Sequence, residues 1–148
     1  MAAAVDALKS PQRPVIIAGN GVRIGQATQT LARLADVLDA PVVTTAAGKG
    51  VFVETDPRAG GPMGTYGLAS ANLLVSEADV LLAVGTKLGP TDTLRGNPRL
   101  INPQRQTLVQ IDTEPLNLGW TFPVHHGLVG DAGPVMAQVM QCWSADPP

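Results

Sequence analysis

The chain has 148 residues, of which 45% are hydrophobic, 3% aromatic and 15% charged, and its formal net charge at pH 7 is −2. This length and hydrophobic content predict one domain whose core needs no disulfide or metal, and the scattered Lys and Arg residues give no basic surface for nucleic acid or anionic lipid. No apolar run approaches the ~20 residues of a membrane-spanning helix and the N-terminus lacks the features of a secretory signal, so we expect a cytoplasmic protein.

The first half of the chain predicts a strand, a glycine-rich turn and a helix. Residues 14–18 are a short apolar run typical of a buried strand, and residues 27–39 carry apolar side chains at helical spacing. The glycines of GNGVRIG at 19–25 permit unusual backbone angles and let a phosphate approach a helix N-terminus without meeting a Cβ. Residues 5–9 resemble the end of a helix that leads into the domain as a linker. The turn therefore predicts a ligand crevice without identifying the ligand.

This glycine turn departs from the dinucleotide-binding fingerprint in two ways. The third glycine falls one position late, which gives GxGxxxG where GxGxxG is expected. The second apolar run ends in Thr44 and Thr45, where an NAD-binding unit places an acid for the ribose hydroxyls. A free-standing Rossmann-like oxidoreductase therefore stays an alternative that the missing acid argues against.

The remainder of the chain alternates long loops with regular elements. In chain order these are a strand (42–44), a loop (48–66), a helix (70–78), a strand (80–84), a loop (90–104), strands (107–111 and 127–130), and a helix (133–143) that Asp131 caps and that carries Pro134 in its first turn. The composition, rich in Val, Leu, Ile and Ala, suits a parallel sheet covered on both faces. We therefore expect an α/β fold, a three-layer α/β/α Rossmann-like domain with a mainly parallel sheet of five to six strands.

The residues that directly follow the strands are the candidates for a site, because ligands of open parallel sheets bind outside the carboxyl ends of the strands. These segments contain backbone donors, hydroxyls, lysines and acids, but neither the residue order of a hydrolase triad nor a GxSxG elbow. The GKG at 48–50 is not a phosphate loop, because a glycine stands where Ser or Thr should follow Lys49. We therefore expect a binding site without catalytic residues.

Charged side chains near the strand ends have more than one interpretation. Lys87 and Arg23 either meet a phosphate or are solvated. Asp112 and Glu114 lie two residues apart and are expected to bind a hydroxyl or cap a turn rather than perform acid–base catalysis.

The remaining reactive and aromatic residues are expected to be structural. His125 and His126 are adjacent, so in an extended segment they point to opposite faces and cannot share a metal ion, and we expect no metal site. Trp120 and Phe122 are expected to anchor the loop before the last strand. Cys142 has no second cysteine to pair with and is expected in or beside a packed face.

An ordered series of motifs resembles the central domain of thiamine diphosphate-dependent enzymes of the acetolactate synthase type. The matching segments are RPVIIAGNG (13–21), PVVTTAAGKG (41–50), GPMGTYG (61–67), EADVLLAVG (77–85), QID (110–112) and GDA (130–132). Each is weak alone, but together they cover nearly the whole chain in the family's order. The resemblance implies a linker and helix tail at 1–12, the central domain at 13–143 and a tail at 144–148.

The resemblance implies a parent polypeptide of three domains, of which this chain looks like the middle one. In the family a pyrimidine-binding domain supplies the catalytic glutamate, and another domain binds the diphosphate through magnesium. The family's metal motif starts with GDG, whereas Asp131 is followed by Ala132, so the magnesium site is expected elsewhere and this chain alone is expected to be inactive. The parent would decarboxylate a 2-keto acid, with pyruvate favoured, pass the carbanion to an acceptor carbonyl, and form a homo-oligomer with its sister domains in place.

The resemblance also implies a cofactor-binding crevice in this domain, which holds FAD in some members, an ADP moiety in others and nothing in the rest. By position, the contacts fall on Gly19, Gly21, Thr44, Gly50, Gly64, Gly85, Lys87, Asp112 and Asp131. Acetolactate synthases carry an arginine where this chain has Lys87, and a lysine does not reproduce the forked donor geometry of arginine. A nucleotide site and a structural module with a vacant crevice therefore both stay open.

Overall fold

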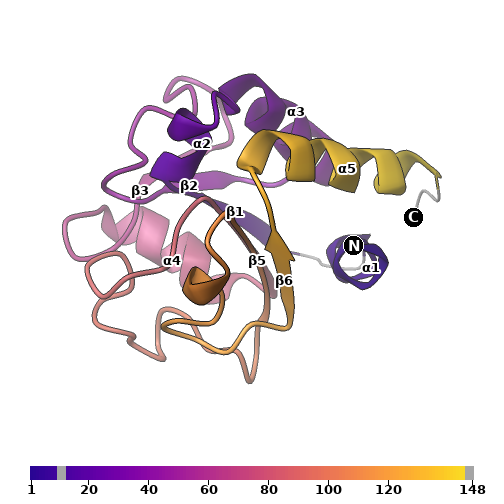
Figure 1. Ribbon diagram of the computed structural model, residues 1–148. Coiled ribbons are helices and arrows are strands. Elements are labelled where there is room, and N and C mark those ends of the chain that lie inside the picture. Colours follow the sequence, from indigo (N-terminus) through magenta and orange to yellow (C-terminus); the bar gives the residue numbers. More distant parts are fainter. Residues whose placement is uncertain (10–12, 146–148) are drawn as a thin grey trace.

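Six parallel strands form one sheet in residues 1–9 and 13–145, which the computed structural model describes, in the order β3-β2-β1-β4-β5-β6 (Figure 1). The strands are β1 (Pro14–Ala18), β2 (Val42–Thr44), β3 (Ala59–Pro62), β4 (Val80–Val84), β5 (Thr107–Asp112) and β6 (His126–Val129). The chain builds outward from β1 to β3 and then returns to place β4 on the other side of β1. This reversal is the topological switch point at which open α/β sheets bind ligands.

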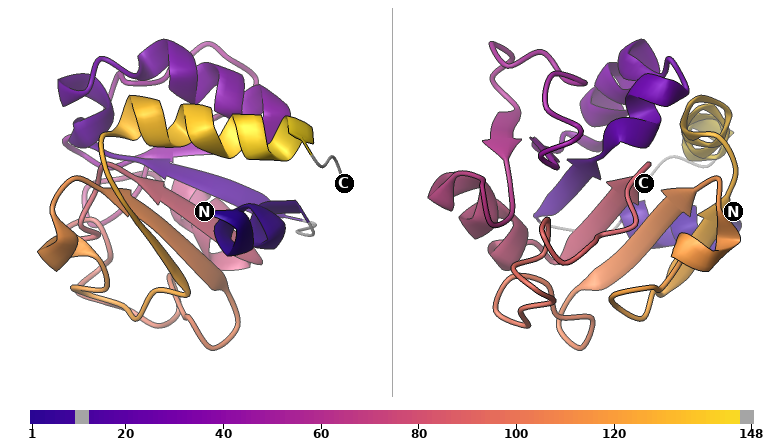
Figure 2. Two further views of the ribbon diagram at one scale, coloured as in Figure 1. Left: turned by 45° about the vertical axis from the view of Figure 1, so that its right-hand side comes forward. Right: turned by 60° about the vertical axis from the view of Figure 1, so that its left-hand side comes forward.

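Helices cover both faces of this sheet, which confirms the predicted three-layer Rossmann-like fold (Figure 2). The helices are α1 (Ala2–Lys9), α2 (Asn20–Ile24), α3 (Thr28–Leu38), α4 (Ala69–Glu77) and α5 (Ala132–Ala145), with a 3-10 turn η1 (Pro115–Asn117). On one face of the sheet, α3 and α5 lie side by side, and α1 and α2 contribute to the same core. On the other face, α4 and the long loops cover the sheet. None of the described helices has the length and hydropathy needed to cross a membrane.

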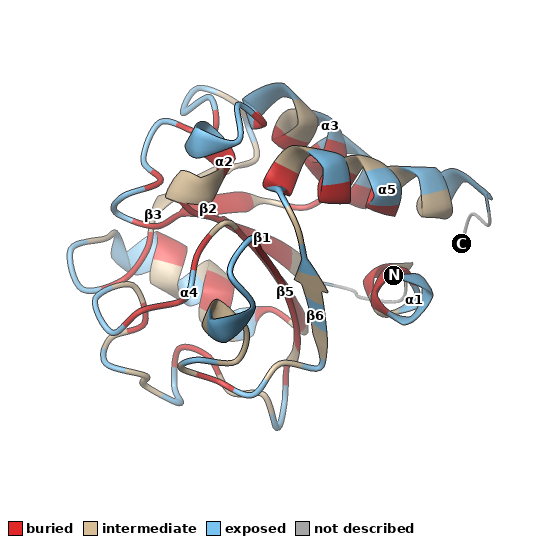
Figure 3. Ribbon diagram, in the orientation of Figure 1, coloured by how far each residue is buried: buried red, intermediate tan, exposed pale blue. Residues whose placement is uncertain are grey.

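The central strands β1 and β4 are continuous hydrophobic runs because both faces of each strand pack against covering layers. Ile16 and Ile17 are neighbours in β1 and both fully buried, yet Ile16 belongs to the core beneath α3 and α5 while Ile17 belongs to the core beneath α4. In Figure 3 the buried residues accordingly run through the middle strands, and exposed residues mark the outer sides of the helices and loops. The sheet therefore forms a rigid platform whose carboxyl edge carries the loops.

The N-terminal segment packs on the domain more extensively than a linker requires. The helix begins at Ala2, and Ala4, Val5 and Leu8 are buried in the same core as α3 and α5. Residues 10–12 of the expected linker and 146–148 of the expected tail lie outside the described residues. The domain boundaries at 13 and 143 stay a prediction.

The glycine turn after β1 differs from the expected one, because the short helix α2 occupies it. Gly19 has φ −102°, so it does not need the unusual backbone angles that we expected of it. A Cβ atom added to Gly19 would lie 2.3 Å from the Gly85 carbonyl oxygen, and one added to Gly21 would lie 2.6 Å from the Gly85 Cα. The glycines are therefore required because the backbone after β1 crosses the backbone after β4.

We expect Gly19→Ala to destabilise the chain by about 1–3 kcal/mol or more, the usual cost of overpacking, because its methyl group would overlap the Gly85 carbonyl. Gly89→Ala is the matched control, since the atoms nearest to a Cβ there are 3.6 and 3.8 Å away. Urea unfolding of both variants measures the difference. Equal stability of the two variants would contradict the crossing.

Candidate functional site

A cavity of about 340 Å³, which we call the crevice, opens at the carboxyl ends of the strands around the switch point. The predicted residues Gly21, Gly85, Lys87 and Asp112 line it. Other lining residues that the sequence analysis did not single out as ligand contacts include Asn20, Thr45, Ala47, Thr86, Asp92 and Asn117. Hydroxyl, amide, carboxylate and ammonium groups thus converge from four separate segments of the chain.

The other predicted site residues lie outside this lining. Gly19 and Thr44 come directly before lining residues, and Gly19 donates its N–H to the Val84 carbonyl at 2.9 Å. Gly50 lines a different cavity, beside α3. Asp131 precedes α5, where its carbonyl accepts the Val135 N–H at 3.1 Å.

Gly64 acts indirectly, by bringing Asp92 to the crevice. Its φ is +92°, and an added Cβ would lie 2.8 Å from the Asp92 Cα, so only glycine allows the two loops to touch. The next residue, Thr65, donates its N–H to the Thr91 carbonyl at 2.9 Å. The GPMGTYG motif therefore supports the Asp92 loop, a contact that spacing along the sequence does not reveal.

The crevice gives Asp92 an unusual environment for a carboxylate. Burial raises the pKa of the Asp92 carboxyl, while a hydrogen bond from the Ala46 N–H and the positive charge of Lys87 act to lower it. Because the first of these causes is the largest, the folded chain favours the uncharged form of Asp92 more than the unfolded chain does.

Asp112 and Glu114 both cap turns, as expected. Asp112 is 8% exposed, and its Oδ1 accepts the Glu114 N–H at 2.9 Å and the Asn117 Nδ2 at 3.0 Å. The Glu114 side chain accepts the Leu116 N–H at 3.1 Å and so begins η1. These bonds fix the Asp112 carboxylate rigidly in the wall of the crevice.

Arg23 holds the loop after β2 in place, a role that neither sequence interpretation anticipated. Its guanidinium donates to the Ala47 carbonyl at 2.9 Å, to the Lys49 carbonyl at 2.6 Å, and to Asn20 Oδ1. Since Thr45 and Ala47 of that loop line the crevice, Arg23 positions one of its walls.

Lys87 and Trp120 form a pair at the surface. Lys87 Nζ lies 4.8 Å from the centroid of the Trp120 ring, within the range of a cation–π contact. Phe122 is buried, as expected of an anchor, whereas Trp120 is 55% exposed. Its packing partner is the lysine side chain.

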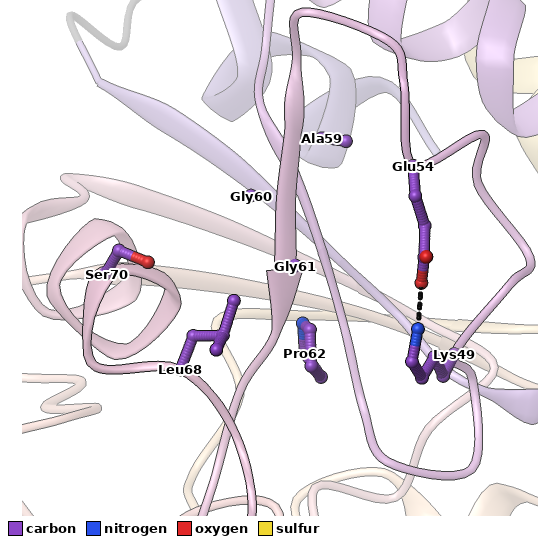
Figure 4. Close-up of a pocket in the computed structure, with 8 residues that line it drawn as sticks. All are labelled: Lys49, Glu54, Ala59, Gly60, Gly61, Pro62, Leu68 and Ser70. Carbon is purple, nitrogen blue, oxygen red and sulfur yellow. Dashed lines mark hydrogen bonds and ion pairs between the residues drawn. The ribbon is translucent and has the colours of Figure 1, made fainter.

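A larger cavity, about 460 Å³ and here called the edge pocket, lies at the outer strand β3, away from the switch point. Figure 4 shows Lys49 and Glu54 pointing toward each other on one side of β3, where they form an ion pair, and Leu68 on the other side. The pair neutralises the charged groups of the pocket, which leaves little to orient a polar ligand. We therefore take the crevice, with its convergent polar groups, as the candidate site.

His125 and Cys142 have structural surroundings. His125 Nδ1 accepts the Leu108 N–H at 3.1 Å, and Cys142 is half-buried against the core. Within residues 1–9 and 13–145, no three His, Cys, Asp or Glu side chains cluster closely enough to hold a metal ion.

Comparisons with known proteins identify relatives of this chain. Residues 1–139 match the family described as thiamine pyrophosphate enzyme, central domain. The chain is 39% identical over 129 residues to a probable acetolactate synthase large subunit of Methanocaldococcus jannaschii, covering 87% of this chain and 21% of that protein. It is 36% identical over 137 residues to a sulfoacetaldehyde acetyltransferase of Alcaligenes xylosoxydans xylosoxydans, covering 93% and 23%. The chain thus spans about a fifth of the length of these curated relatives.

We expect Arg23→Met to release the loop after β2, because three acceptors lose their donor at once. Amide hydrogen exchange at Gly48, Lys49 and Val51 should accelerate by about tenfold or more, the effect of losing hydrogen bonds to a charged group. Arg33→Met, an exposed change on α3, is the control and should leave these rates unchanged. Unaltered exchange in Arg23→Met would show that the loop holds itself.

We expect Asp92→Asn to raise the thermal unfolding midpoint at pH 7. A carboxyl whose pKa is raised on folding contributes stability at low pH and loses it as the pH rises through the folded pKa, whereas asparagine stays neutral throughout. The difference in unfolding midpoint between the variant and the wild type should disappear as the pH falls below the ordinary pKa range of carboxyl groups. Glu77→Gln, at an exposed position, should show no such convergence, and a gap of constant size for Asp92→Asn would refute the burial effect.

Proposed function

This chain belongs to the family of thiamine pyrophosphate enzyme central domains, and we propose that it serves, without catalytic residues of its own, as the middle domain of a longer thiamine diphosphate-dependent enzyme. The short span of the match within its relatives supports this. In this proposal residues 13–143 are the domain unit, and residues 1–12 and 144–148 join it to sister pyrimidine- and diphosphate-binding domains. Thiamine diphosphate and magnesium, held by those domains, would supply the chemistry of decarboxylation.

The parent enzyme, in this proposal, decarboxylates a 2-keto acid, with pyruvate favoured, and transfers the remaining two-carbon unit to an acceptor. The names of the relatives, acetolactate synthase and sulfoacetaldehyde acetyltransferase, denote a synthase and an acetyl transfer. The identities to the two, 39% and 36%, are too close to separate them. We therefore assign the choice of acceptor to residues of the sister domains.

Exposed apolar side chains beside the crevice support contact with those sister domains. Ile24, which lines it, is 77% exposed, Leu116 of η1 is 83% exposed and Trp120 is 55% exposed. Large apolar side chains gathered around a polar site are typical of a surface that another domain covers. In this proposal the parent enzyme forms a homo-oligomer in which a sister domain covers this surface.

Within the domain, we propose that the crevice binds a nucleotide, either ADP or the ADP part of FAD. The observation that carries this is its position at the topological switch point, with polar groups from four segments around it. Its volume of about 340 Å³ is near the lower end of ligand pockets, about 300–1,000 Å³, so a nucleoside-sized portion fits and a whole FAD extends beyond it. The free-standing NAD oxidoreductase is not favoured for two reasons. β2 ends in Thr44, where an NAD-binding unit places an acid, and the Gly85 backbone occupies the space beside Gly19 and Gly21 at the start of α2.

Isothermal titration of the chain with FAD, ADP and NAD tests the crevice. We expect saturable binding of ADP and FAD, and about tenfold or greater weakening by Asp112→Asn, the usual effect on a hydrogen bond to a charged group. Glu77→Gln, remote from the crevice, is the control. Binding of none of the three would favour a structural module with a vacant crevice, and binding of NAD alone would favour the oxidoreductase.

We expect the purified chain to show no turnover of pyruvate when thiamine diphosphate and magnesium are added, because the catalytic glutamate and the diphosphate site are assigned to the sister domains. A coupled assay against a protein-free blank measures this. Steady turnover above the blank would contradict the domain assignment.

A further inference from the structure

We propose that two copies of this chain associate through the outer side of α4 and the edge pocket beside it, a surface that we call the α4 face. Its exposed members are Tyr66, Leu68, Ala69, Ser70 and Leu73. The edge pocket is lined by residues other than those of the crevice, so the role of this face is independent of the ligand that the crevice binds.

Large apolar side chains are exposed on the α4 face. Tyr66, Leu68 and Leu73 are each more than half exposed to solvent. On the inner side of the same helix, Val75 is fully buried in the core beneath α4. The helix thus presents apolar residues both to the sheet and to the outside, and exposed apolar side chains that gather in one place are typical of a surface that another protein covers.

The segment that carries the α4 face has no charge. Residues 59–76 contain no Asp, Glu, Lys, Arg or His, and they form the longest such run in the chain. The outer side of α3, by contrast, carries Arg33 and Asp36, which are both exposed. Because charged residues are depleted at the centre of protein interfaces, the outer side of α4 suits contact with protein and that of α3 suits solvent.

The shape of the α4 face is complementary to a copy of itself. On one side of α4, Leu68 lines the edge pocket of about 460 Å³. On the other side, Leu73 lines a second hollow of about 230 Å³ together with Leu94 and Leu100. The helix is therefore a ridge between two hollows, and in a two-fold dimer the ridge of each copy is able to enter a hollow of the other.

The strand at the border of this face favours contact through side chains. Among the described strands, β3 pairs with β2 alone. It has four residues, ends in Pro62, and shifts its register against β2 between Val42 and Val43. Short and irregular edge strands that contain proline discourage the addition of a further strand. We therefore expect α4 and the edge pocket, and not a continued sheet, to form the contact.

The charges at the edge pocket favour a second copy over a partner with charge of a single sign. Lys49 and Glu54 form an ion pair with each other, and their side chains are each more than half exposed (Figure 4). A two-fold axis brings the same patch of both copies together, so Lys49 is able to face Glu54 of the partner subunit. One positive and one negative group thus complement a second copy, whereas a partner of either sign alone would meet a like charge.

Sedimentation velocity of the chain over a range of concentrations tests the association. We expect the weight-average sedimentation coefficient to rise with concentration. Leu73→Lys should weaken association about tenfold or more, because an ammonium group without a partner would be buried in the contact. Val37→Lys, at another exposed apolar position on a helix, is the matched control and should associate as the wild type does.

Circular dichroism of each variant confirms that it is folded. A wild-type chain that stays monomeric at every concentration would overturn the inference. Association that Leu73→Lys leaves unchanged would overturn it as well, because the contact would then lie on another face.

Charge-reversal variants test whether the partner is a second copy in a two-fold arrangement. Lys49→Glu and Glu54→Lys each place like charges opposite one another in their own dimers, so each variant alone should associate about threefold or more weakly, the scale of two exposed ion pairs. An equimolar mixture of the two variants should recover association, because opposite charges then meet across the axis. A mixture that associates no better than the separate variants would contradict the two-fold contact.

Discussion

The close crossing of two backbone segments at the switch point is the constraint on which the rest of this structure depends. The Gly21 N–H donates to the Gly85 carbonyl at 3.0 Å, and the spaces where Cβ atoms of Gly19 and Gly21 would stand are filled by Gly85. This contact sets how closely the segments after β1 and β4 approach. It thereby sets the floor of the crevice and uses the donors with which a dinucleotide-binding turn would hold phosphate.

The walls of the crevice depend on contacts between loops that are distant in sequence. Arg23 donates hydrogen bonds to the loop after β2. The absence of a side chain at Gly64 allows the loop that carries Asp92 to lie against the Gly64 loop. Asn117 donates a hydrogen bond to Asp112 at the end of β5. Each wall contributes polar groups of a different kind, so the site is a property of the assembled carboxyl edge. Such an arrangement suits the binding of a ligand, and it agrees with the proposed role of a middle domain that leaves catalysis to its sister domains.

The fold was predictable where local pattern and tertiary packing agree. The buried runs at β1 and β4 and the amphipathic α3 were predicted nearly residue for residue, because both faces of the sheet are covered. β3 was not located in the sequence, which placed residues 48–66 in a loop and predicted five to six strands. Its segment AGGP has almost no strand propensity and depends on pairing with β2 across a register shift. α2 was missed because packing of Val22 and the Arg23 contacts stabilise a sequence with weak helix propensity. Asp92 was missed because Gly64, far away in sequence, decides its position.

We propose that the crevice, and not the edge pocket, receives the nucleoside portion of the ligand, and chemical-shift mapping with adenosine distinguishes the two sites. In ¹H–¹⁵N spectra of the chain, we expect the largest shifts on the amides of Gly21, Thr45, Gly85 and Asp112, which line the crevice. Shifts concentrated on Gly60, Gly61 and Ser70, which line the edge pocket, would contradict it, as would a spectrum that adenosine leaves unchanged.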